Sequence, residues 1–259
     1  MKGGMYLKEI CKMTSDEKTV FSILPKVREY DIVAIKINIV INKSGEHNHK
    51  GMMFALKQDE EIIRNLVAAN PGKPVDKVQP LVIRANVGDT IKIHFENKLN
   101  FPTSIHVEGI QYDTLNSDGT ETGNNPSSTV EPGEKTKYRW MADREGTFLF
   151  NDLGNPVSSE TGTNVNGLWG AIIVEAAGSY WTDPITGDES KSGVYADIHH
   201  LKLPNFREFT LMFHDEFPVV FDHNNPPSDP HHSGEPIAHS INYRAEPGRI
   251  RMSMEGCNG

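Results

Sequence analysis

Apolar and polar positions alternate along much of the chain, and this pattern predicts β-strands. In residues 31–41, isoleucine occupies every second position from Ile35 onward, while Lys36 and Asn38 fall between these isoleucines. A period of two is that of a strand with one buried face. A polar turn with two glycines follows, and the apolar stretch up to Leu56 can pair back, so we predict a hairpin.

One segment has helical spacing instead. Residues 59–69 carry acids in the first turn, and Asn70-Pro71-Gly72 provides a stop. The apolar side chains that share one helix face are Ile62, Ile63, Leu66 and Val67. A single short helix is therefore expected inside an otherwise β pattern.

Two strands are predicted within residues 81–99, one on either side of a turn at Val87-Gly88-Asp89. Ile91, Ile93 and Phe95 alternate with polar residues and should line the core side of the second strand. His94 lies between them and is expected to face outward.

Later strands continue the alternation. Residues 135–141 should send Thr136, Tyr138 and Trp140 inward and the basic residues between them to water. Residues 168–175, LWGAIIVE, are almost entirely apolar and indicate a strand that is buried on both faces. This strand is expected to close the first domain.

The apolar pattern divides the chain into four parts. Residues 1–30 form an N-terminal arm, residues 31–177 the first domain, and residues 178–206 a linker by composition. A new strand is predicted from about residue 207, but residues 207–259 hold too little apolar surface to complete a domain. The chain is therefore expected to stop inside a second domain, as a fragment of a longer protein.

Composition narrows the class of partner. The 259 residues carry 26 basic and 35 acidic side chains, a formal charge of -9, which disfavours nucleic acid or an anionic membrane surface. No apolar run is long enough to predict a membrane span, and no secretory signal is visible at the start. Cys11 and Cys257 lie at opposite ends and are interpreted as free thiols.

Four segments carry a resemblance to a known family. VGDTIKIHFENKL, SIHVEGIQYD, EPGEKTKYRW and GLWGAIIVE occur in this order and resemble the first cupredoxin domain of multicopper oxidases. The likeness extends to the ceruloplasmin and clotting-factor branch and to bacterial manganese-oxidase-like proteins, which INYRAEP also resembles. The resemblance implies an all-β fold: a cupredoxin-like Greek-key β-sandwich followed by an incomplete second cupredoxin domain.

The same resemblance implies a function for the intact protein. It would be a copper-dependent oxidoreductase with oxygen as acceptor, in which further cupredoxin domains are partners. Its substrate would be a small reducing molecule or a metal ion such as Mn(II). Extracytoplasmic or cell-surface proteins are common in this family, although the sequence itself names no compartment. The alternative is a non-catalytic cupredoxin module with a binding or structural role.

The copper ligands implied by the family are mostly replaced in this chain. Active first domains carry two His-x-His motifs, but here the motifs read His106-Val107-Glu108 and Asn151-Asp152-Leu153. Three of the four imidazole positions are changed, and Asn151 and Leu153 are poor copper ligands. Cys257 has no neighbouring histidine for a mononuclear copper site. The isolated chain is therefore expected to be inactive, with copper bound by the intact protein only.

The residues at these two motifs have two interpretations, and the first is an altered metal site. His106, Glu108 and Asp152 could together hold a harder ion such as manganese, iron or zinc, because a carboxylate shifts the preference away from copper. A hydrogen-bonded pair at a domain interface is the alternative. Two ligands without a third seldom hold a divalent ion, so Asp152 decides between the two interpretations.

Other histidines form weaker candidates. Seven of the eleven histidines fall within residues 199–239, where their spacing matches no closed zinc pattern. They could bind metals adventitiously or join a site completed by further domains. His47 and His49 lie in a polar turn and are interpreted as solvated residues.

Overall fold

The computed structural model describes residues 24–121, 123–154, 162–219 and 237–246. Most of the expected N-terminal arm lies outside these ranges. So do both cysteines and three histidines of the histidine-rich segment, His223, His231 and His232.

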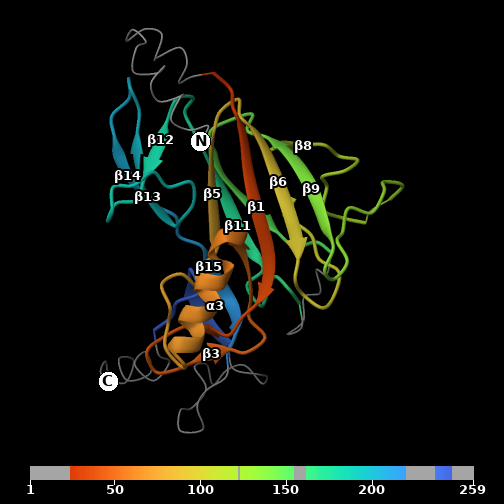
Figure 1. The fold of residues 1–259 in the computed structure, drawn as a ribbon, viewed down its shortest axis with the longest axis vertical. Helices are drawn as coiled ribbons and strands as arrows, with labels where there is room; N and C mark the ends of the chain where they lie inside the picture. Colours follow the sequence, from red (N-terminus) through yellow and green to blue (C-terminus); the bar gives the residue numbers. More distant parts are fainter. Residues whose placement is uncertain (1–23, 122, 155–161, 220–236, 247–259) are drawn as a thin grey trace, which may run out of the picture.

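Two β-sheets face each other and form a sandwich (Figure 1). Sheet I contains, in spatial order, β4 (Met52–Leu56), β1 (Val27–Lys36), β6 (Thr90–Asn97), β9 (Lys135–Met141) and β8 (Gln111–Tyr112). Sheet II contains β5 (Leu81–Asn86), β11 (Trp169–Glu175), β10 (Gly146–Asn151) and β7 (His106–Val107). The predicted all-β sandwich is confirmed.

The chain changes sheets between neighbouring strands. β5 pairs with β11 in sheet II, whereas β6 pairs with β1 and β9 in sheet I. The turn predicted at Val87-Gly88-Asp89 therefore joins the two layers, and the strands on either side of it do not pair with each other. The β1–β6 and β5–β11 pairs are parallel, and every other neighbouring pair in the two sheets is antiparallel.

The space between the sheets is filled by side chains that the alternation predicted. Ile91, Ile93 and Phe95 on β6 are buried, as are Tyr138 and Trp140 on β9. They belong to one apolar cluster that also includes Phe54 and Phe150. Burial of this cluster is the main driving force that holds the two sheets together.

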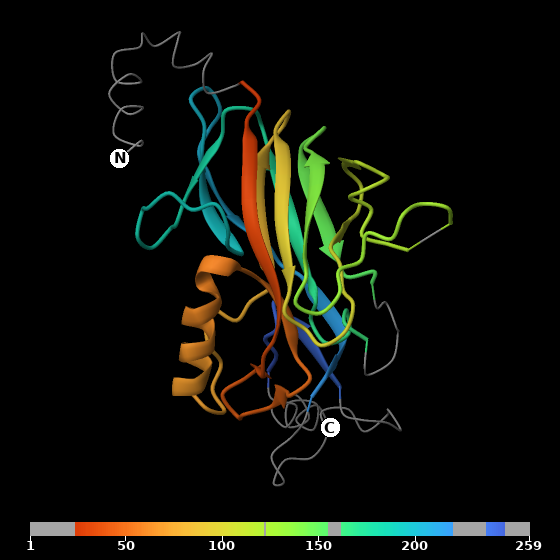
Figure 2. The same cartoon turned by 45° about the vertical axis from the view of Figure 1, so that its right-hand side comes forward.

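A second apolar cluster lies on the outer face of sheet I. β1 contributes Ile32 and Ala34 to the core between the sheets, and Val33 and Ile35 to this outer cluster. The outer face is covered by η1 (Lys57–Asp59) and α3 (Glu60–Ala69), the predicted helix, which Figure 2 shows beside the lower end of β1.

The helix buries less of its apolar face than the spacing suggested. Of its apolar side chains, Ile63 is buried in the outer cluster, whereas Ile62 is 50% exposed. A short ribbon of β2 (Ile39–Val40) and β3 (His47–Asn48) completes this end of the molecule. No helix in the described ranges is long and apolar enough to cross a membrane.

The segment expected to be a linker contains regular structure. β13 (Tyr195–His199) lies at the centre of a three-stranded sheet and pairs antiparallel with both β12 (Tyr180–Thr182) and β14 (Phe206–Phe209). Residues 183–194 connect β12 to β13, and at the start of this connection the Asp183 carboxylate accepts hydrogen bonds from the backbone N–H groups of Ile185 and Thr186. The role of residues 178–206 as a linker between domains stays a prediction. In Figure 1 this layer lies beside β5 and β11, away from β8 and β9.

The strand predicted from about residue 207 is interrupted. β14 ends at Phe209, and β15 (Phe213–Pro218) begins a two-stranded sheet with β16 (Ile237–Ile241). The alternating apolar side chains of this segment are largely exposed: Phe209 65%, Leu211 59% and Phe213 72%. The extent of a second cupredoxin domain remains a prediction.

Truncating Phe150 tests the central role of the core between the sheets. The Phe150 ring lies 5.7 Å from Phe54 and 6.0 Å from Trp140. We expect Phe150→Ala to lower the free energy of unfolding by about 3–5 kcal/mol, because it removes apolar contacts and leaves a cavity.

The matched control is Leu149→Ala on the same strand. Leu149 faces the other way and is 40% exposed, so its truncation should cost about 1 kcal/mol or less. Urea unfolding measured for both variants checks the difference, and equal losses would contradict the assignment of faces.

Candidate functional site

The two motif segments meet at one edge of sheet II. β7 and β10 pair antiparallel, with Val107 opposite Phe150 and His106 opposite Asn151. Directly paired residues present their side chains on the same face of a sheet. The first position of each motif therefore lies next to the other, and this edge is the candidate site.

His106 is held in one orientation. Its Nδ1–H donates to the backbone oxygen of Asp118 over 2.6 Å, and one Asp118 carboxylate oxygen lies 3.7 Å from the same nitrogen. The ring meets Tyr112 edge-on at 5.6 Å, and the Tyr112 hydroxyl donates to the Asp118 carboxylate over 2.9 Å. With the proton on Nδ1, the lone pair is on Nε2, the nitrogen that a metal would use.

Asp152 does not face the same space as His106. It follows Asn151 and is fully buried, and its carboxylate takes part in a hydrogen-bond network. Oδ1 accepts from Ser104 N at 2.7 Å, Gly154 N at 2.9 Å and Ser104 Oγ at 3.2 Å. Oδ2 accepts from Thr163 Oγ1 at 2.6 Å. This carboxylate joins the start of β7 to the end of β10.

Glu108 lies outside the paired part of β7. Its backbone N–H donates to Leu149 O over 2.9 Å, which continues the ladder, but the residue is exposed. Across the described ranges, no three His, Cys, Asp or Glu side chains are grouped so that they could hold a metal ion. The structure thus brings His106 beside Asn151 but does not gather His106, Glu108 and Asp152 into a ligand set.

The donor set of this edge does not fit a copper cluster. Of the four motif positions, His106 alone offers an imidazole, and Leu153 offers no side-chain donor at all. The Oδ1 atom of Asn151 is buried and accepts no hydrogen bond from any described residue. An amide oxygen is a hard donor that copper does not prefer.

Sequence reasoning missed the residues that support His106 and Asp152. Asp118 and Tyr112 orient the imidazole, while Ser104 and Thr163 satisfy the carboxylate. Gly119 was a usable signal, because it has φ +73° and a Cβ there would lie 2.6 Å from Ile105 O. Only glycine allows the loop that carries Asp118 to approach β7 this closely.

The described histidines of residues 199–239 have separate surroundings. His199 stacks on Tyr180 at 4.8 Å, and His200 Nε2 contacts Ala177 O at 3.1 Å. His214 packs between Trp169 and Phe217, where burial lowers its pKa although Asp215 and Glu216 act in the opposite direction. His239 lies 3.7 Å from Asp215 at the surface. These four imidazoles do not converge.

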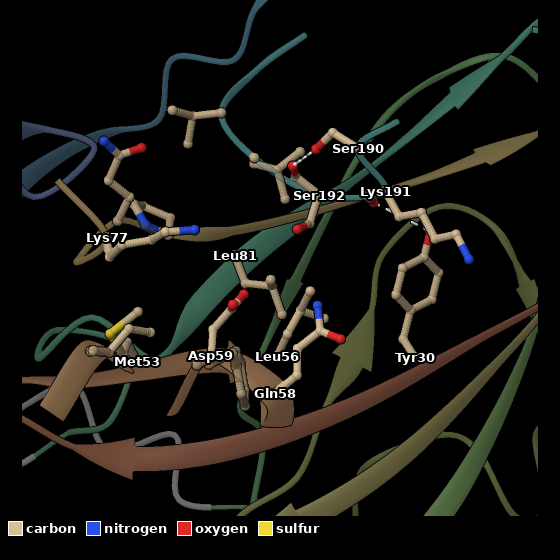
Figure 3. Close-up of a pocket in the computed structure, with 18 of the residues that line it drawn as sticks. Tyr30, Met53, Leu56, Gln58, Asp59, Lys77, Leu81, Ser190, Lys191 and Ser192 are labelled. Carbon is tan, nitrogen blue, oxygen red and sulfur yellow. Dashed lines mark hydrogen bonds between the residues drawn. The ribbon is translucent and has the colours of Figure 1, made fainter. Parts of the chain in front are cut away.

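A groove of about 930 Å³ lies elsewhere, between β4, the start of β5 and residues 189–195 (Figure 3). Its lining mixes carboxylates such as Asp59 with amines such as Lys77, and includes no histidine or cysteine. Tyr30 lies at one end, and its hydroxyl donates to Arg84 O over 2.5 Å. Burial raises the pKa of Tyr30 to about 12. The groove offers no imidazole for copper and does not include β7 or β10.

The middle of the chain is similar to known proteins. Residues 76–179 match the family model described as multicopper oxidase. A probable nitrite reductase-hydroxylamine oxidoreductase fusion protein of Kuenenia stuttgartiensis is 40% identical over 98 residues, 38% of this chain and 11% of that protein. L-ascorbate oxidase of Nicotiana tabacum is 36% identical over 95 residues, 36% of this chain and 15% of that enzyme.

Similarity also reaches human coagulation factor V, which is 36% identical over 104 residues, 38% of this chain and 4% of that protein. Among solved structures, a blue copper oxidase from Nitrosomonas europaea aligns with a TM-score of 0.49 at 19% identity, over 84% of this chain and 54% of that one. The chain thus spans a small part of the curated relatives it matches, 11% of the first.

Replacing Asp152 tests whether its carboxylate stabilises this edge. We expect Asp152→Ala to lower the free energy of unfolding by about 2–4 kcal/mol, because the donors of Ser104, Gly154 and Thr163 lose their acceptor inside the protein. Asp188→Ala, at an exposed position, is the matched control and should change stability by about 0.5 kcal/mol at most. Equal denaturation midpoints for the two variants would refute the structural role.

Proposed function

We propose that the intact protein is a copper-dependent oxidoreductase with oxygen as acceptor, because residues 76–179 match the multicopper oxidase family model. The family match of residues 76–179 is the observation that carries the proposal. The pairing of β7 with β10 supports it, because it places both motif segments side by side. Bound copper would supply single-electron transfer between a reducing substrate and oxygen.

The proposal assigns this domain a supporting role in that chemistry. Its edge offers the imidazole of His106, with Nε2 unprotonated, and otherwise amide, carboxylate and apolar side chains at the motif positions. Hydrogen bonds to the Asp152 carboxylate join the two motif segments. Copper would then be held by further cupredoxin domains of the same protein, against which this sandwich packs.

The substrate is the finer part of the proposal. We infer a metal ion such as Mn(II), because INYRAEP and the four ordered segments resemble the bacterial manganese-oxidase-like branch. A formal charge of -9 also favours cationic over anionic substrates near the surface.

A non-catalytic cupredoxin module is the second candidate. The replacement of three imidazole positions favours it, because an edge without metal ligands can serve binding or packing alone. The gene sequence downstream of Gly259 discriminates between the two. His-x-His and His-Cys-His motifs there support the oxidase, and a stop codon directly after Gly259 supports the module.

Copper loading of the 259-residue chain tests the supporting role directly. We expect no turnover of a phenolic substrate or of Mn(II), because the edge lacks the ligands for a cluster. Oxygen consumption and substrate oxidation are measured after incubation with Cu(II) and removal of loosely bound metal. Steady turnover by the isolated chain would contradict the proposal.

Placing histidines at the three other motif positions tests whether this edge of sheet II can bring four imidazoles together around copper. The variant Glu108→His/Asn151→His/Leu153→His should bind Cu(II) at least about tenfold more tightly than the parent chain, by isothermal titration. The control variant Glu61→His/Glu131→His/Asp188→His adds three histidines at exposed, separate positions and should show no such gain.

A further replacement, His106→Ala, should abolish the gain in the restored variant, because it removes the imidazole that the parent chain already supplies. Background binding by the histidine-rich segment is common to all these variants and therefore cancels in the comparison. An equal gain in Cu(II) affinity in the control variant would show that the motif positions are not arranged to bind one copper ion together.

A further inference from the structure

A buried arginine lies on the outer face of sheet II. On β5, Ile83 and Ala85 point into the core between the sheets, so Arg84 points away from it. Arg84 is nevertheless fully buried, because the β12–β14 layer covers this face. A buried guanidinium cannot lose its proton and needs compensating negative charge.

Two carboxylates from different elements supply that charge. Arg84 Nη1 lies 2.8 Å from Glu208 Oε1 on β14 and 3.6 Å from Glu175 Oε1 on β11. Arg84 Nη2 also donates to the backbone oxygen of Gly193 over 3.4 Å. We call Arg84, Glu175 and Glu208 the charge cluster. It joins two strands of the sandwich to the outermost strand of the next layer.

The charge cluster has one carboxylate too many. The Arg84 guanidinium balances one negative charge, so two ionised carboxylates would leave a net negative charge in a poorly solvated place. Glu175 Oε1 and Glu208 Oε1 are both enclosed, and neither forms a well-aligned hydrogen bond with a described group. Burial, and then the negative charge of the neighbouring Glu208 carboxylate, raise the pKa of Glu175 to about 7, against the opposing effect of Arg84.

Among the described residues, Arg84 is the cation that lowers the pKa of Glu175. Glu145, which precedes β10, also raises the pKa of Glu175 because it adds a further negative charge. The groups that face Glu175 are thus one cation, Arg84, and two anions, Glu208 and Glu145. Proton uptake is the route by which this cluster can reach neutrality near pH 7.

The charge cluster lies within a small contact between the two layers. Beside it, Val82 and Ile173 of sheet II pack against Val194 in an apolar group of three buried residues. Asn86 Nδ2 donates to Ser179 O over 2.9 Å at the neighbouring position. The Arg28 guanidinium also lies over the Trp181 ring of β12, 4.7 Å from its centroid. The charge state of the cluster therefore contributes to the attachment of the layer together with these contacts.

We propose that the charge cluster is a pH-sensitive interlock, which holds the β12–β14 layer on the sandwich while its two carboxyls share a proton and loosens the layer when both are ionised. The interlock lies at the end of the multicopper oxidase domain, where the chain continues into the β12–β14 layer. It therefore lets pH control how firmly that layer is attached to the domain. The proposal requires no copper and is independent of the proposed oxidase function.

The direction of the pH effect comes from linkage. The folded chain retains the proton of Glu175 up to about pH 7, whereas an opened or unfolded chain releases it near its ordinary value of 4.5. Between these values the closed state binds more protons, so its stability falls as the pH rises. The stabilisation is complete below about pH 4.5 and is lost through pH 7.

Hydrogen exchange of backbone amides tests the interlock in the full 259-residue chain. Protection factors of β13 and β14 amides are compared at pH 5.5 and pH 8, after correction for intrinsic rates. We expect them to fall about tenfold or more over this range, since one unit of pKa difference corresponds to a tenfold effect. Amides of β6 and β9 in sheet I serve as the internal reference and should change far less.

Glu175→Gln imitates the protonated carboxyl at every pH. We expect this variant to show the same high protection of β13 and β14 at pH 8 as the parent shows at pH 5.5. The matched control, Glu131→Gln, removes the same charge from an exposed turn and should keep the parent's pH dependence.

Two results would overturn the interlock. One is protection of β13 and β14 in the parent chain that does not depend on pH. The other is a Glu175→Gln variant with the parent's full pH dependence. Glu208→Gln, at a partly exposed position, is the second variant if Glu175→Gln does not fold. The pH series on the parent chain decides the question even if neither variant folds.

Discussion

Burial of aromatic side chains between two sheets is the interaction on which the rest of this structure depends. Phe54 and Phe95 from sheet I meet Phe150 from sheet II in one apolar cluster, together with Tyr138 and Trp140. Phe150 is the residue directly before the second motif, so the contact that closes the core also fixes where Asn151 and Asp152 emerge. The candidate site is therefore a product of core packing.

Hydrogen bonding at the edge of sheet II holds the two motif segments together. Two segments separated by more than forty residues along the chain must be held side by side, and the Asp152 carboxylate accepts bonds from both. A buried carboxylate with several donors stabilises such a junction without a metal. The two segments can thus be held side by side by hydrogen bonds to Asp152.

Polar groups also join the sandwich to the β12–β14 layer. The cluster of Arg84, Glu175 and Glu208 lies next to a small apolar contact, so electrostatics contributes to this attachment more than it does to the core. The core and the attachment differ in their response to solution conditions. The stabilisation from apolar burial does not depend on pH, whereas the stability of a buried cluster of one cation and two carboxyls does depend on pH.

Alternation located β6 and β9, because a period of two marks the buried face of a strand directly, and a continuous apolar run located β11. Helical spacing likewise located α3, although it overestimated how much of Ile62 would be buried. The motif positions and the loss of three imidazoles could also be read from the chain itself.

Only the tertiary structure decided which strands pair and which polar side chains meet. Nothing local tells β5 and β6 to join different sheets, and nothing local tells Asp152 to turn toward Ser104 and Thr163. Composition also concealed β12 and β13, because their few apolar residues are separated by turn-forming ones. Such contacts depend on the register and packing of distant segments, and a pattern read along one stretch of chain contains no information about distance in space.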